Sequence, residues 1–131
     1  MPPEVAIVAA DAKRLSVLDL IETLQAQQNL NNTMVRQLGG HMLDEPTDLD
    51  TLLLNAKQTL RDALWVGRQE ALEADLPRLS SRLGSELNQV RANVTPSRPA
   101  YADESPVLLS RLRALNAHDL ELWEWANQAL F

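Results

Sequence analysis

Five side chains between positions 91 and 98 could together bind an anion. They are two arginines, two hydroxyl residues and one amide, namely Arg91, Asn93, Thr95, Ser97 and Arg98. Arginine forms forked, charge-assisted hydrogen bonds with phosphate and sulfate groups, and hydroxyl and amide groups add further donors. No acidic residue occurs from position 87 to position 101, so the local charge also suits an anion. A chance gap in the acids of a solvated surface also explains this pattern, and that alternative stays open.

Other arrangements of catalytic residues are absent from the sequence. A phosphate-binding loop needs a glycine-rich turn followed by Lys-Ser or Lys-Thr, which these glycines and lysines cannot form: Gly39, Gly40, Gly67, Gly84, Lys13 and Lys57. His41 and His118 are far apart, and we expect both at the surface. No Ser/His/Asp set, carboxylate pair or cysteine is present to replace them. The sequence therefore predicts no catalytic residue and no metal site.

Length and composition restrict the classes of protein that remain. With 131 residues, the chain is expected to form one domain, residues 1–131. Its formal net charge of −6 argues against nucleic acid or anionic lipid as a partner. No run of 18 apolar residues predicts a membrane span, and the N-terminus lacks the basic start of a secretory signal. We therefore expect a cytoplasmic protein.

Capping signals and apolar spacing predict that the chain is mainly helical. Four pairs of residues are typical of a helix start: Ser16 with Asp19, Thr47 with Asp50, Ser105 with Pro106, and Asn116 with Asp119. These signals and the pattern of the segments between them predict helices over residues 16–28, 33–38, 47–62, 69–82, 85–91, 105–115 and 116–130. The Gly39-Gly40 pair should end the second of them. The 47–62 helix should bury Leu49, Leu52, Leu53, Ala56 and Leu60.

Two segments leave the helical pattern. Residues 63–67 form an apolar run that ends in Gly67, and the change of rhythm there favours a short strand over the end of a helix. Pro77 falls inside the predicted 69–82 helix, which it should kink or divide. We therefore expect one or two short strands at most among the helices.

Trp123 and Trp125 cannot share one face of a helix, because they are two positions apart. One of them should lie in the core, while the other packs against a neighbouring element or a partner. This pattern suggests one possible function, a non-enzymatic helical module for protein–protein interaction. Such a module would associate with a partner chain or with itself through its C-terminal helix.

Several stretches, in their order along the chain, resemble a known family. They are Asn32-Thr33-Met34-Val35-Arg36-Gln37-Leu38-Gly39-Gly40, the units 56–67 and 70–83, Arg91-Ala92-Asn93-Val94-Thr95 with Arg98-Pro99, and the stretch 115–126 with Phe131. Together they are similar to the C-terminal portion of the sulfotransferase family that includes bacterial carbohydrate-type enzymes and, more distantly, the heparan sulfate 2-O-sulfotransferases. The resemblance covers most of residues 16–131.

The resemblance implies the helical C-terminal part of a P-loop-type α/β sulfotransferase fold. Enzymes of this family transfer a sulfuryl group from 3′-phosphoadenylyl sulfate to a hydroxyl. By resemblance, Arg91, Asn93 and Thr95 would contact this cofactor, with Ser97 and Arg98 as looser candidates. The family's lysine and threonine segment for the phosphosulfate, its Arg…Ser pair for the 3′-phosphate and most of its parallel sheet have no counterpart here. Whether the chain is an enzyme stays open, and by itself it should be inactive.

Overall fold

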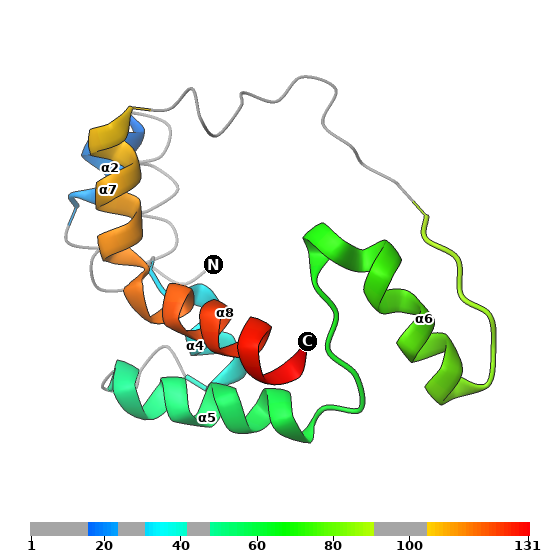
Figure 1. Ribbon diagram of the computed structural model, residues 1–131. Helices are drawn as coiled ribbons and strands as arrows, with labels where there is room; N and C mark the ends of the chain where they lie inside the picture. Colours follow the sequence, from blue (N-terminus) through cyan, green and yellow to red (C-terminus); the bar gives the residue numbers. More distant parts are fainter. Residues whose placement is uncertain (1–15, 24–30, 42–47, 91–104) are drawn as a thin grey trace, which may run out of the picture.

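The computed structural model describes residues 16–23, 31–41, 48–90 and 105–131 (Figure 1). In these ranges the regular secondary structure is entirely helical, and loops connect the helices. The elements are α2 (Val17–Ile21), α4 (Thr33–Leu38), α5 (Leu49–Asp62), the 3₁₀ helix η1 (Gln69–Ala71), α6 (Leu72–Leu83), α7 (Pro106–Leu115) and α8 (Ala117–Leu130). The prediction of a mainly helical chain is confirmed. No strand occurs in these four ranges, so the strand predicted at 63–67 is wrong.

The hydrophobic core lies where α4, α5 and α8 meet. Val35, Leu53, Ala56 and Leu122 are buried there, each at most 5% exposed. Partly buried side chains surround this centre: Leu38, Leu49, Leu52, Leu60 and Trp125. The apolar face predicted for the 47–62 helix is therefore confirmed, because all five of its residues are core residues or pack on the core.

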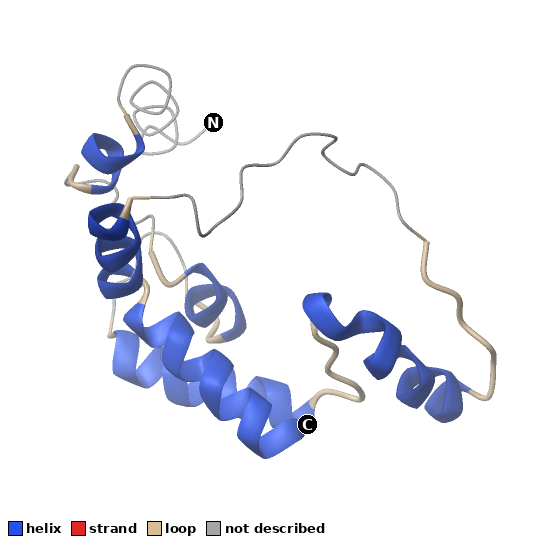
Figure 2. Cartoon of the chain, turned by 45° about the horizontal axis from the view of Figure 1, so that its top comes forward, coloured by secondary structure: helices blue, strands red, loops and turns tan. Residues whose placement is uncertain are grey.

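The remaining helices extend to either side of this core. α2 packs against α7, which leads directly into α8 (Figure 1). α6 lies apart from the α4–α5–α8 group in both views and is connected to α5 through residues 63–68 and η1 (Figure 2). No described helix is both long enough and apolar enough to span a membrane.

The starts of the helices follow local capping chemistry. The Ser16 Oγ accepts a hydrogen bond from the backbone N–H of Asp19 at 3.2 Å, as the spacing predicts. Ser105 caps α7 with Pro106 as its first residue. The N-cap of α5 is Asp48, one position after the predicted Thr47, and its carboxylate accepts hydrogen bonds from the backbone N–H groups of Asp50 and Thr51. Hydrogen bonds from Thr51, from its hydroxyl above all, lower the pKa of the Asp48 carboxyl.

Gly39 is required by the close approach of α4 and α5. A Cβ atom at this position would lie 2.6 Å from the carbonyl oxygen of Leu52. No side chain fits at that distance without moving the α5 backbone. The predicted helix end at Gly39-Gly40 is thus confirmed, and the first glycine also lets the two helices touch.

The predicted strand at 63–67 is an extended loop whose carbonyl groups bind side chains. A strand needs a neighbouring strand to pair its backbone groups, and none lies in the described ranges. Arg82 Nη1 donates a hydrogen bond to the carbonyl oxygen of Leu64, and Arg78 Nη2 donates to that of Val66 at 3.3 Å. Arginines from α6 therefore take the place of a strand partner.

Other helix predictions need correction. α2 ends at Ile21, so the helix expected to reach residue 28 stops earlier; residues 24–30 lie outside the described ranges. Pro77 lies within an unbroken α6, and the division falls at the η1–α6 boundary instead. Residues 85–90 are exposed and not helical, because Gly84 ends α6 in the left-handed conformation with a φ of 69°.

Candidate functional site

The predicted anion loop lies outside the described residues. The described chain stops at Val90 and resumes at Ser105, so the structure gives no position for Arg91, Asn93, Thr95, Ser97 or Arg98. Cofactor binding by these five residues stays a prediction. The sites that the structure does build involve other residues.

Two helices begin at the same place and exchange capping groups there. The Asn32 Oδ1 accepts a hydrogen bond from the backbone N–H of Asp119 at 3.0 Å. In return, the Asp119 carboxylate accepts from the backbone N–H groups of Met34 at 3.1 Å and Val35 at 2.8 Å. The Asn116 Oδ1 accepts from the backbone N–H of Asn32 at 2.9 Å. We call this set of residues 32–35 and 116–119 the helix-start junction.

The helix-start junction satisfies backbone groups that helices leave without partners. The first amides of a helix have no partner inside it, and a carboxylate near them also interacts favourably with the helix dipole. Asn32 reaches this position because it adopts a left-handed backbone with a φ of 50°, which asparagine tolerates better than most residues. Asn116 was expected to cap its own helix, yet its side chain makes no such bond and contacts Asn32 instead.

Arg36 is a buried cation beside this junction. It is 9% exposed and donates from Nε to the carbonyl oxygen of Asn31 at 2.7 Å and from Nη2 to the Asn31 Oδ1 at 3.0 Å. Burial lowers the pKa of Arg36, while the negative charge of Asp119 opposes this shift. Its Nη1 lies 3.5 Å from the His41 Nε2, so His41 faces this cluster and is only partly exposed.

Asp75 is the buried acid of a second cluster, at the start of α6. Only 3% of this residue is exposed, and its carboxylate accepts hydrogen bonds from the Arg68 backbone N–H, Nε and Nη2, each at 2.9 Å. These bonds lower the pKa of the Asp75 carboxyl far below its usual value, and the positive charge of Arg78 contributes. Both guanidinium groups also lie over the Phe131 ring, at 4.1 Å and 4.9 Å from its centre.

The two tryptophans of α8 have the different environments that their spacing predicts. Trp125 packs against the core, and its ring lies beneath Arg61 at 4.9 Å and Lys57 at 5.7 Å. Trp123 is 48% exposed, and its Nε1 donates to Glu70 at 3.3 Å.

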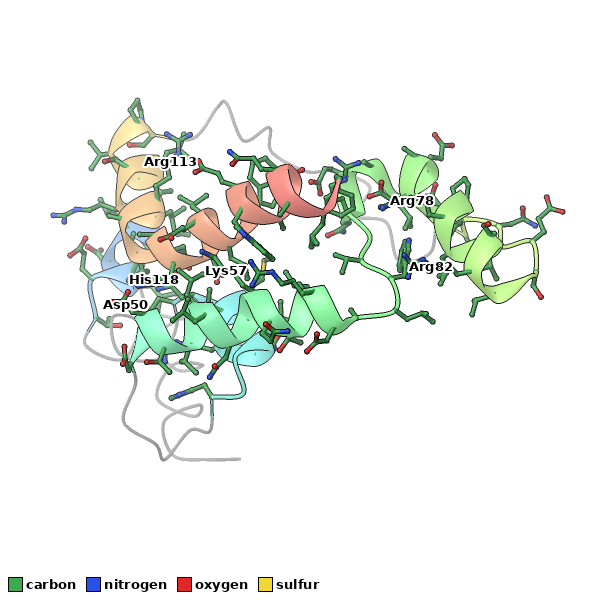
Figure 3. All side chains as sticks on the ribbon, turned by 60° about the horizontal axis from the view of Figure 1, so that its bottom comes forward. Asp50, Lys57, Arg78, Arg82, Arg113 and His118 are labelled. Carbon is green, nitrogen blue, oxygen red and sulfur yellow. The ribbon has the colours of Figure 1, made fainter. Side chains whose placement is uncertain are left out.

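His118 was expected at the surface, but it is half-buried. Its Nε2 lies 2.8 Å from the Asp50 Oδ1, so this side chain joins α8 to the start of α5 (Figure 3).

A mostly apolar pocket of about 310 Å³ lies between α8 and the segment that leads to η1. Side chains from α4, α5 and α8 line it, together with residues 66–70. Its charged members are already paired, because Arg68 binds Asp75 and Glu70 accepts from Trp123. No group of three metal-binding side chains occurs among the described residues. The described geometry thus provides an apolar pocket bordered by paired charges.

The sequence contained a partial signal for these clusters. Asp119 was identified by its spacing from Asn116, but its role in capping α4 depends on an approach of segments more than eighty residues apart. Arg68 and Asp75 are seven positions apart, but Arg68 precedes η1 and Asp75 lies in α6, so their pairing does not follow from the periodicity of one helix.

Comparisons with protein-family models, with curated proteins and with solved structures give no significant match to the chain.

Proposed function

We propose that the chain is the helical, cofactor-side part of a sulfotransferase-like protein, in which the loop at 91–98 contacts 3′-phosphoadenylyl sulfate. The supporting observation is the helix-start junction. Two stretches that carry the family resemblance, 32–40 and 115–126, are distant in sequence, and the junction joins them through mutual hydrogen bonds. If these stretches belong to one inherited framework, they are expected to meet in this way.

In this proposal the helices hold the two ends of the cofactor loop. α6 precedes it and α7 follows it, and α7 leads into α8, which the helix-start junction fixes to α4. Arg91, Asn93 and Thr95 would contact the nucleotide, with Ser97 and Arg98 as looser contacts. These 131 residues contain no glycine-rich phosphate loop to position the transferred group. We therefore propose binding without turnover for this chain alone.

Thermal unfolding with adenosine 3′,5′-bisphosphate, the desulfated cofactor, tests the binding. A ligand that binds only the folded state raises the melting midpoint. We expect an upward shift that Arg91→Ala abolishes and that Arg113→Ala, an exposed arginine of α7, retains. A cooperative melt that does not move with the nucleotide would contradict the proposal. Sulfated product from cofactor and sugar acceptors would instead contradict the expected inactivity.

A second function, self-association through α8, has its own supporting observation. Three large apolar side chains at the surface of this segment are at least 36% exposed: Leu120, Trp123 and Phe131. Trp123 is the better probe of such a contact, since Trp125 packs on the core and its removal would disturb folding. If α8 joins two copies, Trp123→Ala should convert a dimer to a folded monomer in light scattering. A monomeric wild-type chain at high concentration would exclude this function.

A further inference from the structure

Three arginines line a second, smaller pocket beside the 63–66 loop. The pocket has a volume of about 160 Å³ and includes Arg61 at the end of α5 and Arg78 and Arg82 on α6. None of the described residues that line it is acidic. The other lining residues are Leu60, Ala63, Leu64, Trp65, Val66 and Leu130. A concentration of positive charge is notable in a chain whose formal net charge is −6.

Hydrogen bonds to the loop hold two of these arginines in place. Arg82 donates to the carbonyl oxygen of Leu64 and Arg78 to that of Val66, and both side chains extend from α6 toward this loop (Figure 3). A guanidinium group carries five N–H donors, so each arginine keeps donors for a ligand after one such bond. The site is therefore partly ordered before a ligand arrives, which reduces the entropic cost of binding.

The charge of these arginines is only partly neutralised. Arg78 lies 3.4 Å from Asp75 Oδ1, but that carboxylate already accepts shorter bonds from Arg68. Among the described residues, neither Arg61 nor Arg82 forms an ion pair. Arg61 lies over the Trp125 ring, with its guanidinium carbon 4.9 Å from the ring centre, and its N–H groups donate no hydrogen bond among the described residues.

We propose that this pocket binds a phosphate monoester that carries a small apolar or aromatic group. The phosphate would accept hydrogen bonds from Arg61, Arg78 and Arg82, because arginine matches its oxygens with forked donors and a full positive charge. Trp65 and Leu130 line the same pocket and offer apolar surface to the organic part of the ligand. This site does not rest on the sulfotransferase proposal, since it uses none of the residues 91–98.

Phenyl phosphate is a suitable probe, with inorganic phosphate, phenyl sulfate and benzoate as comparisons. Heteronuclear NMR titrations of the full chain at constant ionic strength would report where each compound binds. We expect saturable shifts in residues 60–66 and 78–82 with phenyl phosphate, and weaker binding of inorganic phosphate, which lacks the apolar part. Tighter binding of benzoate or phenyl sulfate would overturn the assignment to phosphate monoesters. Equal, non-saturating shifts with every compound would overturn the site itself.

Arg61→Gln is the decisive variant, because Arg61 donates to no backbone carbonyl among the described residues and its loss should leave the loop in place. Losing one charged donor should weaken phenyl phosphate binding by about tenfold. Arg82→Gln should weaken it further, and Arg113→Gln on α7 is the matched control with the same charge change. Unchanged affinity in Arg61→Gln would overturn the proposal. In Arg61→Gln, adenosine 3′,5′-bisphosphate should still raise the melting midpoint, whereas in Arg91→Ala it should not. This pair of results would show that the pocket and the loop at 91–98 are distinct sites.

Discussion

Asn32, at the start of α4, and Asp119, in the first turn of α8, each accept hydrogen bonds from the first amides of the other residue's helix. The side-chain oxygen of Asn32 accepts the backbone N–H of Asp119 in α8, and the Asp119 carboxylate accepts the backbone N–H groups of Met34 and Val35 in α4. Both interactions join the N-terminal part of the chain to its C-terminal part. The arrangement ties α8 to α4 at one end, while Leu122 and Val35 join them in the core a turn later.

Removing the Asp119 carboxylate should destabilise the fold. Asp119→Ala leaves two helix amides without their acceptor, and loss of a capping side chain costs about 1–2 kcal/mol. Urea unfolding measures this change. Glu121→Ala, an exposed acid two positions later that pairs with Lys57, is the control and should cost less than about 0.5 kcal/mol. Equal effects of the two substitutions would contradict the capping role.

A double-mutant cycle should reveal the coupling of Asn32 and Asp119. Asn32→Gly removes the side chain, and glycine adopts the left-handed backbone readily, so backbone strain does not contribute to the change in the free energy of unfolding. Because the two residues share one hydrogen-bond network, the loss of stability in the double variant should differ from the sum of the two single losses. We expect an interaction energy of about 0.5 kcal/mol or more. Additive losses in the free energy of unfolding would show that the two caps act independently.

The centre of the core should be sensitive to truncation at Leu122. This side chain is fully buried, so Leu122→Ala should lower the free energy of unfolding by about 2–5 kcal/mol. Leu120→Ala removes the same atoms from a residue that is 42% exposed, and we expect a change below about 1 kcal/mol. Chemical denaturation of both variants tests the position of the core directly. Similar losses of unfolding free energy in the two variants would contradict this orientation of α8, in which Leu122 is buried and Leu120 exposed.

The ion pair between Arg68 and Asp75 should make stability depend on pH. The pKa of Asp75 is lowered in the folded state, so its contribution is complete above the pKa of an unfolded aspartate, about 4. As the pH falls below that value, the contribution is lost progressively. Asp75→Asn should therefore lower the melting midpoint at pH 7, and its difference from the wild type should shrink toward pH 2.5. Glu73→Gln is the matched charge change on the same helix, and a constant difference for Asp75→Asn would contradict the prediction.

Local signals in the sequence predicted most of the helix ends. Ser16, Ser105 and the Gly39-Gly40 pair act through neighbouring backbone groups, so their effect can be read within one helical turn. The apolar face of α5 was predicted for a similar reason, because helical periodicity alone selects it. The separate environments of Trp123 and Trp125 also follow from their spacing.

Contacts between distant segments could not be predicted in this way. Apolar residues at 63–67 suggested a strand, but whether a strand forms depends on a pairing partner, and here Arg78 and Arg82 bind the carbonyl groups instead. The exchange of caps at the helix-start junction likewise depends on tertiary structure. The loop at 91–98 lies outside the described residues, so the cofactor site proposed there is argued from its residue types and from the family resemblance.

Calorimetric titration with adenosine 3′,5′-bisphosphate is the most direct test of the proposed function. The account predicts saturable binding that Arg91→Ala abolishes and that both Arg113→Ala and Arg61→Gln retain. A melting shift reports binding anywhere on the folded chain, whereas the titration also gives the number of binding sites. No binding by the wild-type chain, or undiminished binding by Arg91→Ala, would contradict the assignment of the loop at 91–98 to a sulfotransferase-type cofactor.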